Sequence, residues 1–244
     1  VVQPTHLMHG AEYDEMVEVI DNYKDKFESV AIAEPMLGEV GDDATVINDD
    51  KKAVAQAITD EACKVAGYDS MEAAAEDGTA FVFMGHGTSH TANVTYDQMQ
   101  TQMEDLGFTN AFIGTVEGEP EDTACEEVIA KVKDAGFKKV VLRPLMVVAG
   151  DHANNDMAGD DEDSWKSQFE ASGAFDSVDC QIEGLGRVAA VEDLYVAHTK
   201  DAIDSLGTAD DAAEVTDDTE EASDDAAAEE TTDDAADTTE EAAE

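Results

Sequence analysis

Short apolar runs alternate with longer segments whose apolar residues have helical spacing, from about residue 80 to residue 205. The runs predict strands at 80–84, 111–116, 139–143 and 177–182, and the segments between and after them predict helices at 92–106, 122–135, 163–171 and 188–205. Alternating strands and helices are typical of a parallel sheet with helices on both faces. We therefore expect an α/β lobe over residues 76–207.

Residues 1–75 predict the remainder of another lobe of the same kind. Here the pattern predicts strand ends at 1–4 and 30–33, helices at 12–27 and 49–66, and a polar linker at 69–78. The segment 1–12 also resembles 141–152, with proline, glycine and a polar residue at matching places. Because the chain opens at Val1 inside an apolar run, we expect the opening strands of this first lobe to be missing.

The C-terminal segment 208–244 has a different composition. From Ala209 to Glu244 it holds seventeen Asp or Glu residues and no Lys or Arg. Such a segment has too few apolar side chains to offset the entropy lost on folding. We expect a disordered acidic tail.

The whole chain carries a formal charge of −47, which excludes several classes of partner. No basic patch can form to neutralise phosphates, so we expect no binding to nucleic acid or to an anionic membrane surface. No run of apolar residues is long enough to span a bilayer. Three widely spaced cysteines, Cys63, Cys125 and Cys180, predict reduced thiols and a cytoplasmic location, with secretion left open by the missing start.

Three residues that can bind metals or transfer protons stand where predicted strands end. His86 follows the strand at 80–84, Glu117 follows 111–116, and His152 lies in the long loop after 139–143. The carboxyl ends of parallel strands meet at one edge of a sheet, where ligands bind. Two imidazoles and a carboxylate suit a divalent transition metal.

Glycines and hydroxyl side chains surround these residues and predict a place for a substrate. Glycine lets a ligand approach the backbone closely, and Thr or Ser can donate to an anion. The residues that we expect to contact a substrate are Gly85, Gly87, Thr88, Ser89, Gly118 and, from the first lobe, His6. Asp151, Asp156 and Asp160 are candidates to support His152, while His198 is expected on the surface.

At these segments the chain resembles the anaerobic-type sirohydrochlorin cobaltochelatases. The resemblance is carried by Met84-Gly85-His86-Gly87-Thr88, by Gly114-Thr115-Val116-Glu117-Gly118, and by the segment from Pro144 through Gly150-Asp151-His152 to Lys166. It covers roughly residues 1–205 and implies a chelatase-like fold of two Rossmann-like lobes with a tetrapyrrole cleft between them. It also implies that His86, Glu117 and His152 bind the metal ion and that a histidine takes a pyrrole proton.

The resemblance implies insertion of cobalt(II) into sirohydrochlorin during anaerobic cobalamin synthesis. Cobalt would be a substrate, with no prosthetic group, and the oligomeric state stays open, with a homo-oligomer as one candidate. Imidazole and carboxylate select no single metal strongly, so a ferrochelatase or nickel chelatase stays open. A tetrapyrrole or metal carrier without turnover and a metal-dependent hydrolase are further alternatives.

Overall fold

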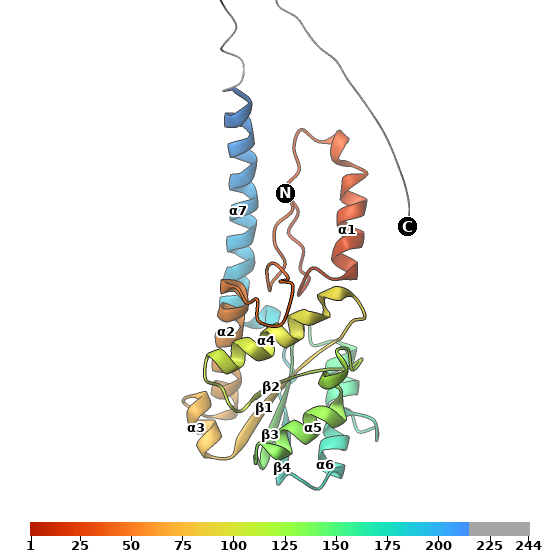
Figure 1. The fold of residues 1–244 in the computed structure, drawn as a ribbon, viewed down its shortest axis with the longest axis vertical. Helices are drawn as coiled ribbons and strands as arrows, with labels where there is room; N and C mark the ends of the chain where they lie inside the picture. Colours follow the sequence, from red (N-terminus) through yellow and green to blue (C-terminus); the bar gives the residue numbers. More distant parts are fainter. Residues whose placement is uncertain (215–244) are drawn as a thin grey trace, which may run out of the picture.

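Four parallel strands form the centre of the molecule (Figure 1). The computed structural model describes residues 1–214, and its strands are β1 (Thr79–Gly85), β2 (Ala111–Thr115), β3 (Lys139–Pro144) and β4 (Ser177–Cys180). Their order across the sheet is β2-β1-β3-β4. The chain adds β2 on one side of β1 and then adds β3 and β4 on the other side. The strand order therefore reverses at β1, and α/β sheets bind ligands at such a switch point.

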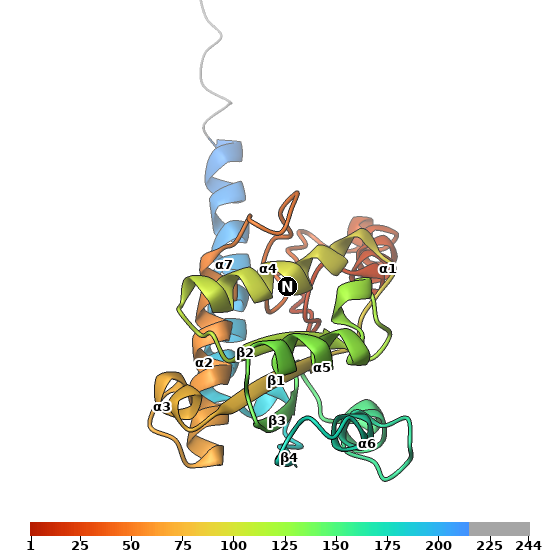
Figure 2. The same cartoon turned by 60° about the horizontal axis from the view of Figure 1, so that its bottom comes forward.

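Helices cover both faces of this sheet (Figures 1 and 2). On one face lie α2 (Asp49–Ala66) and α4 (Val94–Asp105), with α7 (Ala189–Glu214) packed against α2; on the other lie α5 (Cys125–Asp134) and α6 (Trp165–Ala171). Alternate residues of each strand point to opposite faces, which produces two apolar cores. The predicted α/β class, with a parallel sheet flanked by helices, is confirmed.

The larger core joins residues from both sides of the predicted boundary near residue 75. Leu37 and Ile58 are fully buried together with Phe81 and Phe83 of β1. The helix α2 that carries Ile58 has the predicted bounds, because the side chain of Asn48 accepts from the Lys51 N–H at its start. The division into domains at this position stays a prediction.

The first 47 residues are less regular than the sequence predicts. The two predicted strand ends pair only through the parallel bridge Val2–Ile32. The predicted helix 12–27 is wrong in its second half: α1 spans Ala11–Asp21, and a 3-10 turn, η1 (Lys24–Lys26), follows. The Asn22 side chain binds the Glu18 carbonyl at the point where the helix stops. No residue of α1 is buried, so its apolar stripe has no core that would prolong it.

Several other elements differ from the predicted ones. The predicted linker 69–78 contains the short helix α3 (Met71–Glu76), which buries Met71 and Ala74 and is capped by the Ser70 side chain. The strand β4 ends two residues early. A π-helical turn, η4 (His152–Met157), lies in the predicted loop after β3. Three 3-10 turns complete the fold: η2 (Thr91–Asn93), η3 (Glu121–Thr123) and η5 (Leu185–Arg187).

The last helix also differs from expectation. The predicted stop at Gly207 is wrong, since α7 continues to Glu214, and a glycine inside a helix costs only about 1 kcal/mol relative to alanine. Residues 208–214 of the predicted tail thus continue α7, and the rest of it, 215–244, lies outside the described residues.

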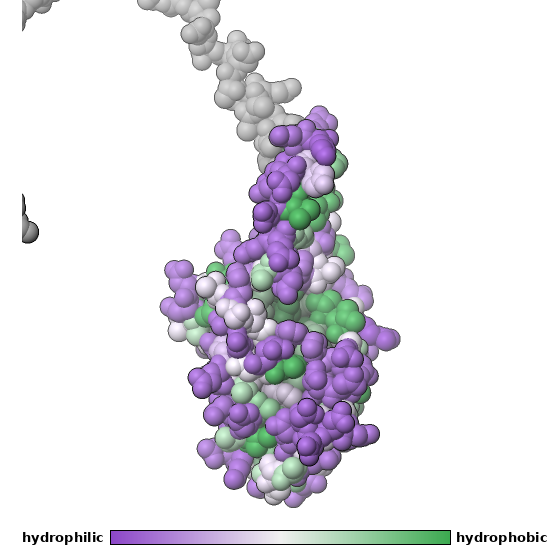
Figure 3. Space-filling view, turned by 90° about the vertical axis from the view of Figure 1, so that its right-hand side faces the viewer, coloured by the Kyte–Doolittle hydropathy of each residue, from purple (hydrophilic) through white to green (hydrophobic). Residues whose placement is uncertain are grey.

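The polarity of the surface and the state of the cysteines can be described for residues 1–214. The face that carries α1 is mostly hydrophilic, with apolar residues gathered in smaller patches (Figure 3). Among residues 1–214, each helix is too short or too polar to cross a lipid bilayer. Cys63, Cys125 and Cys180 form no disulfide, and burial raises the pKa of the Cys63 and Cys180 thiols to about 11.

Candidate active site

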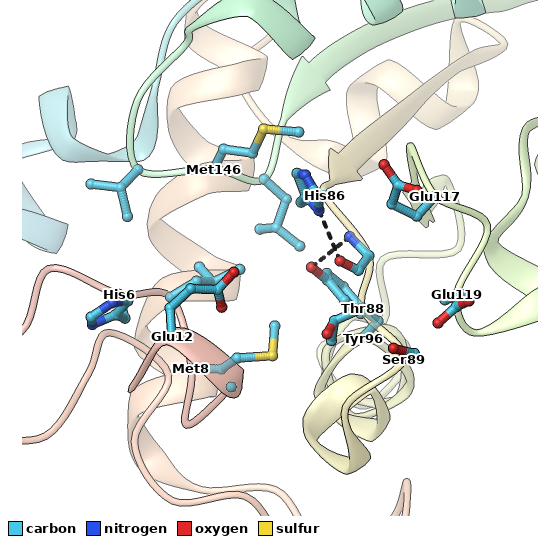
Figure 4. Close-up of a pocket in the computed structure, with 15 residues that line it drawn as sticks. His6, Met8, Glu12, His86, Thr88, Ser89, Tyr96, Glu117, Glu119 and Met146 are labelled. Atoms are coloured by element: carbon cyan, nitrogen blue, oxygen red, sulfur yellow. Dashed lines mark hydrogen bonds between the residues drawn. The ribbon is translucent and has the colours of Figure 1, made fainter. Parts of the chain in front are cut away.

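A cavity of about 640 Å³ opens at the carboxyl ends of the strands. Three strand-end loops line one side of it, and the segment that leads into α1 lines the other (Figure 4). Its lining residues are His6, Leu7, Met8, Gly10, Glu12, His86, Gly87, Thr88, Ser89, Tyr96, Glu117, Glu119, Leu145, Met146 and Val147. Most residues predicted to contact metal or substrate therefore lie around one hollow.

His86 follows the central strand β1, and its imidazole is exposed to solvent. Its Nδ1 lies 2.9 Å from the carbonyl oxygen of Gly87, and a carbonyl can only accept, so Nδ1 carries the proton. The lone pair is consequently on Nε2, which is free to bind a metal ion or accept a proton.

Two glycines beside His86 are required by close contacts. A Cβ on Gly85 would lie 2.3 Å from the Tyr96 ring, and Gly87 has a φ of +93° with its Cβ position 3.0 Å from the Cβ of Glu117. The Tyr96 hydroxyl also accepts from the Gly87 N–H at 3.0 Å. Burial raises the pKa of Tyr96, so its hydroxyl remains a neutral hydrogen-bonding group.

Glu117 is placed beside His86 by backbone pairing that continues beyond the strands. The Val116 N–H donates to the Gly85 carbonyl at 3.0 Å, and the Glu117 N–H donates to the His86 carbonyl at 2.9 Å. Within the described residues the Glu117 carboxylate makes no hydrogen bond or ion pair, and it is exposed. It is therefore free to change rotamer when a ligand enters.

His152 reaches the same place from the first turn of η4. Its ring lies edge-on to the His86 ring, with 4.6 Å between centroids. Its Nδ1 is 2.5 Å from Oδ2 of Asp156, four residues later, so that its Nε2 also carries the lone pair when the ring is neutral. Of the other predicted supports, Asp151 binds the Asn155 side chain and Asp160 lies 3.9 Å from Lys166.

The predicted metal ligands are thus neighbours, but they are not arranged around an ion. In residues 1–214, no group of three or more His, Cys, Asp or Glu side chains has a geometry that could hold a metal. His152 is also absent from the cavity lining, although it touches His86, which lines it. A joint site needs the Glu117 side chain to turn toward the two imidazoles.

The opposite side of the cavity comes from the first lobe. His6 lines it with a buried Nδ1 that has no hydrogen-bond partner among the described residues, and Glu12 projects from the first turn of α1 (Figure 4). The His6 carbonyl is held by the Met36 N–H and by the Tyr195 hydroxyl. The cavity lining contains three glutamates and neither Lys nor Arg.

Comparison with known proteins identifies a family for the chain. The profile of the cobalt chelatase (CbiK) family matches residues 1–204. The sirohydrochlorin cobaltochelatase of Salmonella typhimurium is 32% identical over 203 residues, which are 83% of this chain and 68% of that protein. The sirohydrochlorin cobaltochelatase CbiKC of Nitratidesulfovibrio vulgaris is 29% identical over 209 residues, 84% of this chain and 65% of that protein.

The chain belongs to the cobalt chelatase family. The family resemblance predicted from the strand-end motifs is confirmed, and the match ends ten residues before the end of α7. The matched part amounts to about two thirds of each of these two relatives.

Sequence reasoning missed some residues of the cavity and misplaced one histidine elsewhere in the chain. Glu12 and Glu119 carry charge into the cavity, and only the match of Glu12 to His152 in the internal repeat pointed to either. The expectation that His198 lies on the surface is wrong: its side chain is 8% exposed. It binds the Glu34 carbonyl through Nδ1 and lies 3.1 Å from Asp50 through Nε2, because α7 packs against α2.

Proposed function

We propose that this protein is a cobaltochelatase that inserts cobalt(II) into sirohydrochlorin. The observation that carries the proposal is the contact between the His86 and His152 rings at 4.6 Å, in which both Nδ1 atoms are bound to oxygen and both Nε2 atoms remain available. Membership of the cobalt chelatase family and two relatives named for this activity support it.

The chemistry requires a site that holds an ion loosely and accepts protons. Cobalt(II) replaces the two N–H protons of the macrocycle, so one ion enters and two protons leave. The Nε2 atoms of His86 and His152 and the Glu117 carboxylate would hold the ion with coordination positions left open, as a transfer site needs. Imidazole and carboxylate groups that the ion releases on transfer can then take the departing protons.

The cavity offers surfaces suited to a flat apolar ring with a polar rim. Leu7 and Met8 lie on one side and Leu145, Met146 and Val147 on the other, so apolar side chains can pack against the macrocycle. Thr88 and Ser89 can donate to its carboxylates.

Absorbance measurement tests the proposal directly. The protein is mixed with sirohydrochlorin and cobalt, iron or nickel, and metal insertion is followed by the change in the macrocycle spectrum. We expect catalytic turnover with cobalt, lost in His86→Ala and in His152→Ala. His90→Ala is the matched control, since His90 lies four residues from His86 and outside the cavity lining; it should leave kcat unchanged and raise KM only slightly, through loss of its contact with Asp14. Binding without turnover would instead identify a carrier, and faster insertion of iron or nickel would change the metal assignment.

Two finer points belong to the same proposal. A cytoplasmic location is supported by the three free thiols. A homo-oligomer is supported by the exposed apolar side chains Val19 and Phe27, of which 57% and 64% of the surface is accessible. Sedimentation of the full chain tests the second point, and a monomer at micromolar concentration would contradict it.

A further inference from the structure

Apart from the histidines, all side chains in the cavity lining that carry a charge at neutral pH are negative. Glu12 enters from α1, while Glu117 and Glu119 enter from the loop after β2, and Figure 4 shows them on opposite sides of His86. No Lys or Arg lines the cavity to balance them. A polyanionic macrocycle is therefore repelled from the empty site, whereas a cation is attracted to it.

Glu119 is the carboxylate in this set whose role the metal site leaves unexplained. Its backbone is fixed: the Glu119 N–H donates to the Thr115 hydroxyl at 3.1 Å, and its carbonyl accepts from the Thr88 N–H at 3.4 Å. Its side chain makes no hydrogen bond or ion pair within the described residues. The structure thus holds a free negative charge at the cavity wall.

The lysine that binds this loop has another partner than Glu119. Lys131 of α5 binds Asp122 through both its carbonyl and its Oδ2, each at 2.7 Å. The same loop adds Glu121 outside the cavity lining. The field of the loop is consequently negative where an anionic substrate must pass.

From this arrangement we infer that the cavity fills in a set order, divalent metal ion first and macrocycle second, and that Glu119 enforces the order. The inference rests on the proposed function. A bound ion cancels two of the three carboxylate charges, and the macrocycle then meets a nearly neutral cavity. By thermodynamic linkage, each substrate increases the affinity of the cavity for the other.

The test compares Glu119→Gln with Glu121→Gln, which removes the same charge from the same loop outside the cavity. Three quantities are measured at low ionic strength: the Kd of metal-free sirohydrochlorin without cobalt, by fluorescence; the Kd of cobalt alone, by competition with a chromophoric chelator; and insertion rates after each order of mixing, by stopped flow. Neither glutamine should disturb folding, because neither carboxylate has a partner in the described part of the chain.

We expect Glu119→Gln to tighten binding of the metal-free macrocycle about fivefold, because it removes one charge that repels the carboxylates of the substrate. It should weaken cobalt binding, while Glu121→Gln changes either constant less than about twofold. In the wild type, protein preloaded with cobalt should insert the metal faster than protein preloaded with macrocycle. Equal effects of the two variants, or faster insertion after macrocycle loading, would overturn the inference.

Failure of this inference is distinguishable from failure of the proposed function. If the wild type inserts cobalt but the two variants bind the macrocycle alike, the order is not set by Glu119 and the chelatase assignment stands. If no order of mixing gives insertion, the chelatase assignment fails, and with it the inference, whatever the two binding constants show.

Discussion

The two sides of the cavity are built in different ways. On the sheet side, His86, Glu117 and His152 follow strands whose side chains are almost completely buried in two cores. On the other side, His6 and Glu12 belong to a segment with a single β-bridge and a helix without any buried residue. The difference suggests that the sheet side fixes the metal chemistry, while the first-lobe side is held by a few apolar anchors, such as Met8 and Leu37, and by individual polar contacts.

Two of these polar contacts can be changed by single substitutions. Lys51 of α2 is fully buried and donates to the carbonyls of Leu37 and Glu39, at 3.0 and 2.7 Å. The imidazole of His90 lies 3.2 Å from Asp14 of α1 across the edge of the site. The two sides can therefore be perturbed separately, which allows four predictions, given from the largest expected effect to the smallest.

Loss of a metal-binding imidazole on the sheet side should have the largest effect. We expect His86→Ala to lower kcat/KM for cobalt insertion by at least about a hundredfold, because replacing even a residue that supports a ligand can cost that much. The side chain is exposed, so the midpoint of urea unfolding should stay unchanged. A variant with full activity would show that the sheet side does not carry the chemistry.

Removal of the buried Lys51 amine on the first-lobe side should lower the stability of the protein. Lys51→Met leaves the buried Leu37 carbonyl and the partly buried Glu39 carbonyl without their donor and should cost about 2 kcal/mol in the free energy of unfolding. Burial lowers the pKa of Lys51 to about 8, below its value in the unfolded chain. Between these two values the unfolded state binds more protons, so wild-type stability rises with pH there.

The variant lacks that titration, so its deficit relative to the wild type should grow from about pH 8 toward pH 10.5. Urea unfolding of both proteins at several pH values measures the difference, in which other titrating groups cancel. A deficit that shrinks over this range would mean that Lys51 is not held in a desolvated position.

The partner of His152 should have an intermediate effect. We expect Asp156→Asn to lower cobalt insertion about tenfold, since the amide accepts a weaker hydrogen bond and orients the imidazole less firmly. The decrease should appear in the affinity for cobalt, measured by chelator competition. Asp160→Asn is the control, because Asp160 is remote from the ring and only 3.9 Å from Lys166.

The smallest effect is expected where the two sides meet at the surface. Asp14→Asn removes the carboxylate that contacts Nε2 of His90, and exposed contacts of this kind contribute at most about 1 kcal/mol. We expect KM for sirohydrochlorin to rise less than about fivefold, with kcat unchanged. A larger loss would show that the contact does more than attach α1, and would weaken the contrast between the two sides.

The sequence predictions also succeeded to different degrees on the two sides of the cavity. The β-strands near His86 and Glu117 have short apolar runs that end at glycine, so their positions and the edge where they meet could be derived from the pattern. The apolar stripe of α1 resembles that of a packed helix, yet nothing in the described structure buries it. The spacing of apolar residues cannot show whether another element packs against them. His198 was misplaced because its burial depends on α2, which is far from it in sequence.

The candidate site was predictable in its imidazoles but not in its charges. His86 and His152 stand out because histidine is scarce in the chain, His86 lies between two glycines, and His152 lies two residues after Gly150. Glu119 is one of 60 acidic residues, and only the path of the loop after β2 distinguishes it from Glu121. The i to i+4 contact between His152 and Asp156 depends on a π-helical turn that no sequence pattern indicated.

The core shared by Leu37, Ile58, Phe81 and Phe83 has a practical consequence. A truncated protein that begins at residue 76 would lose α2 and present the uncovered side chains of one sheet face to water. Such a fragment should precipitate or form soluble aggregates when expressed. Mutational dissection of the active site therefore has to be carried out by point substitution in the whole chain.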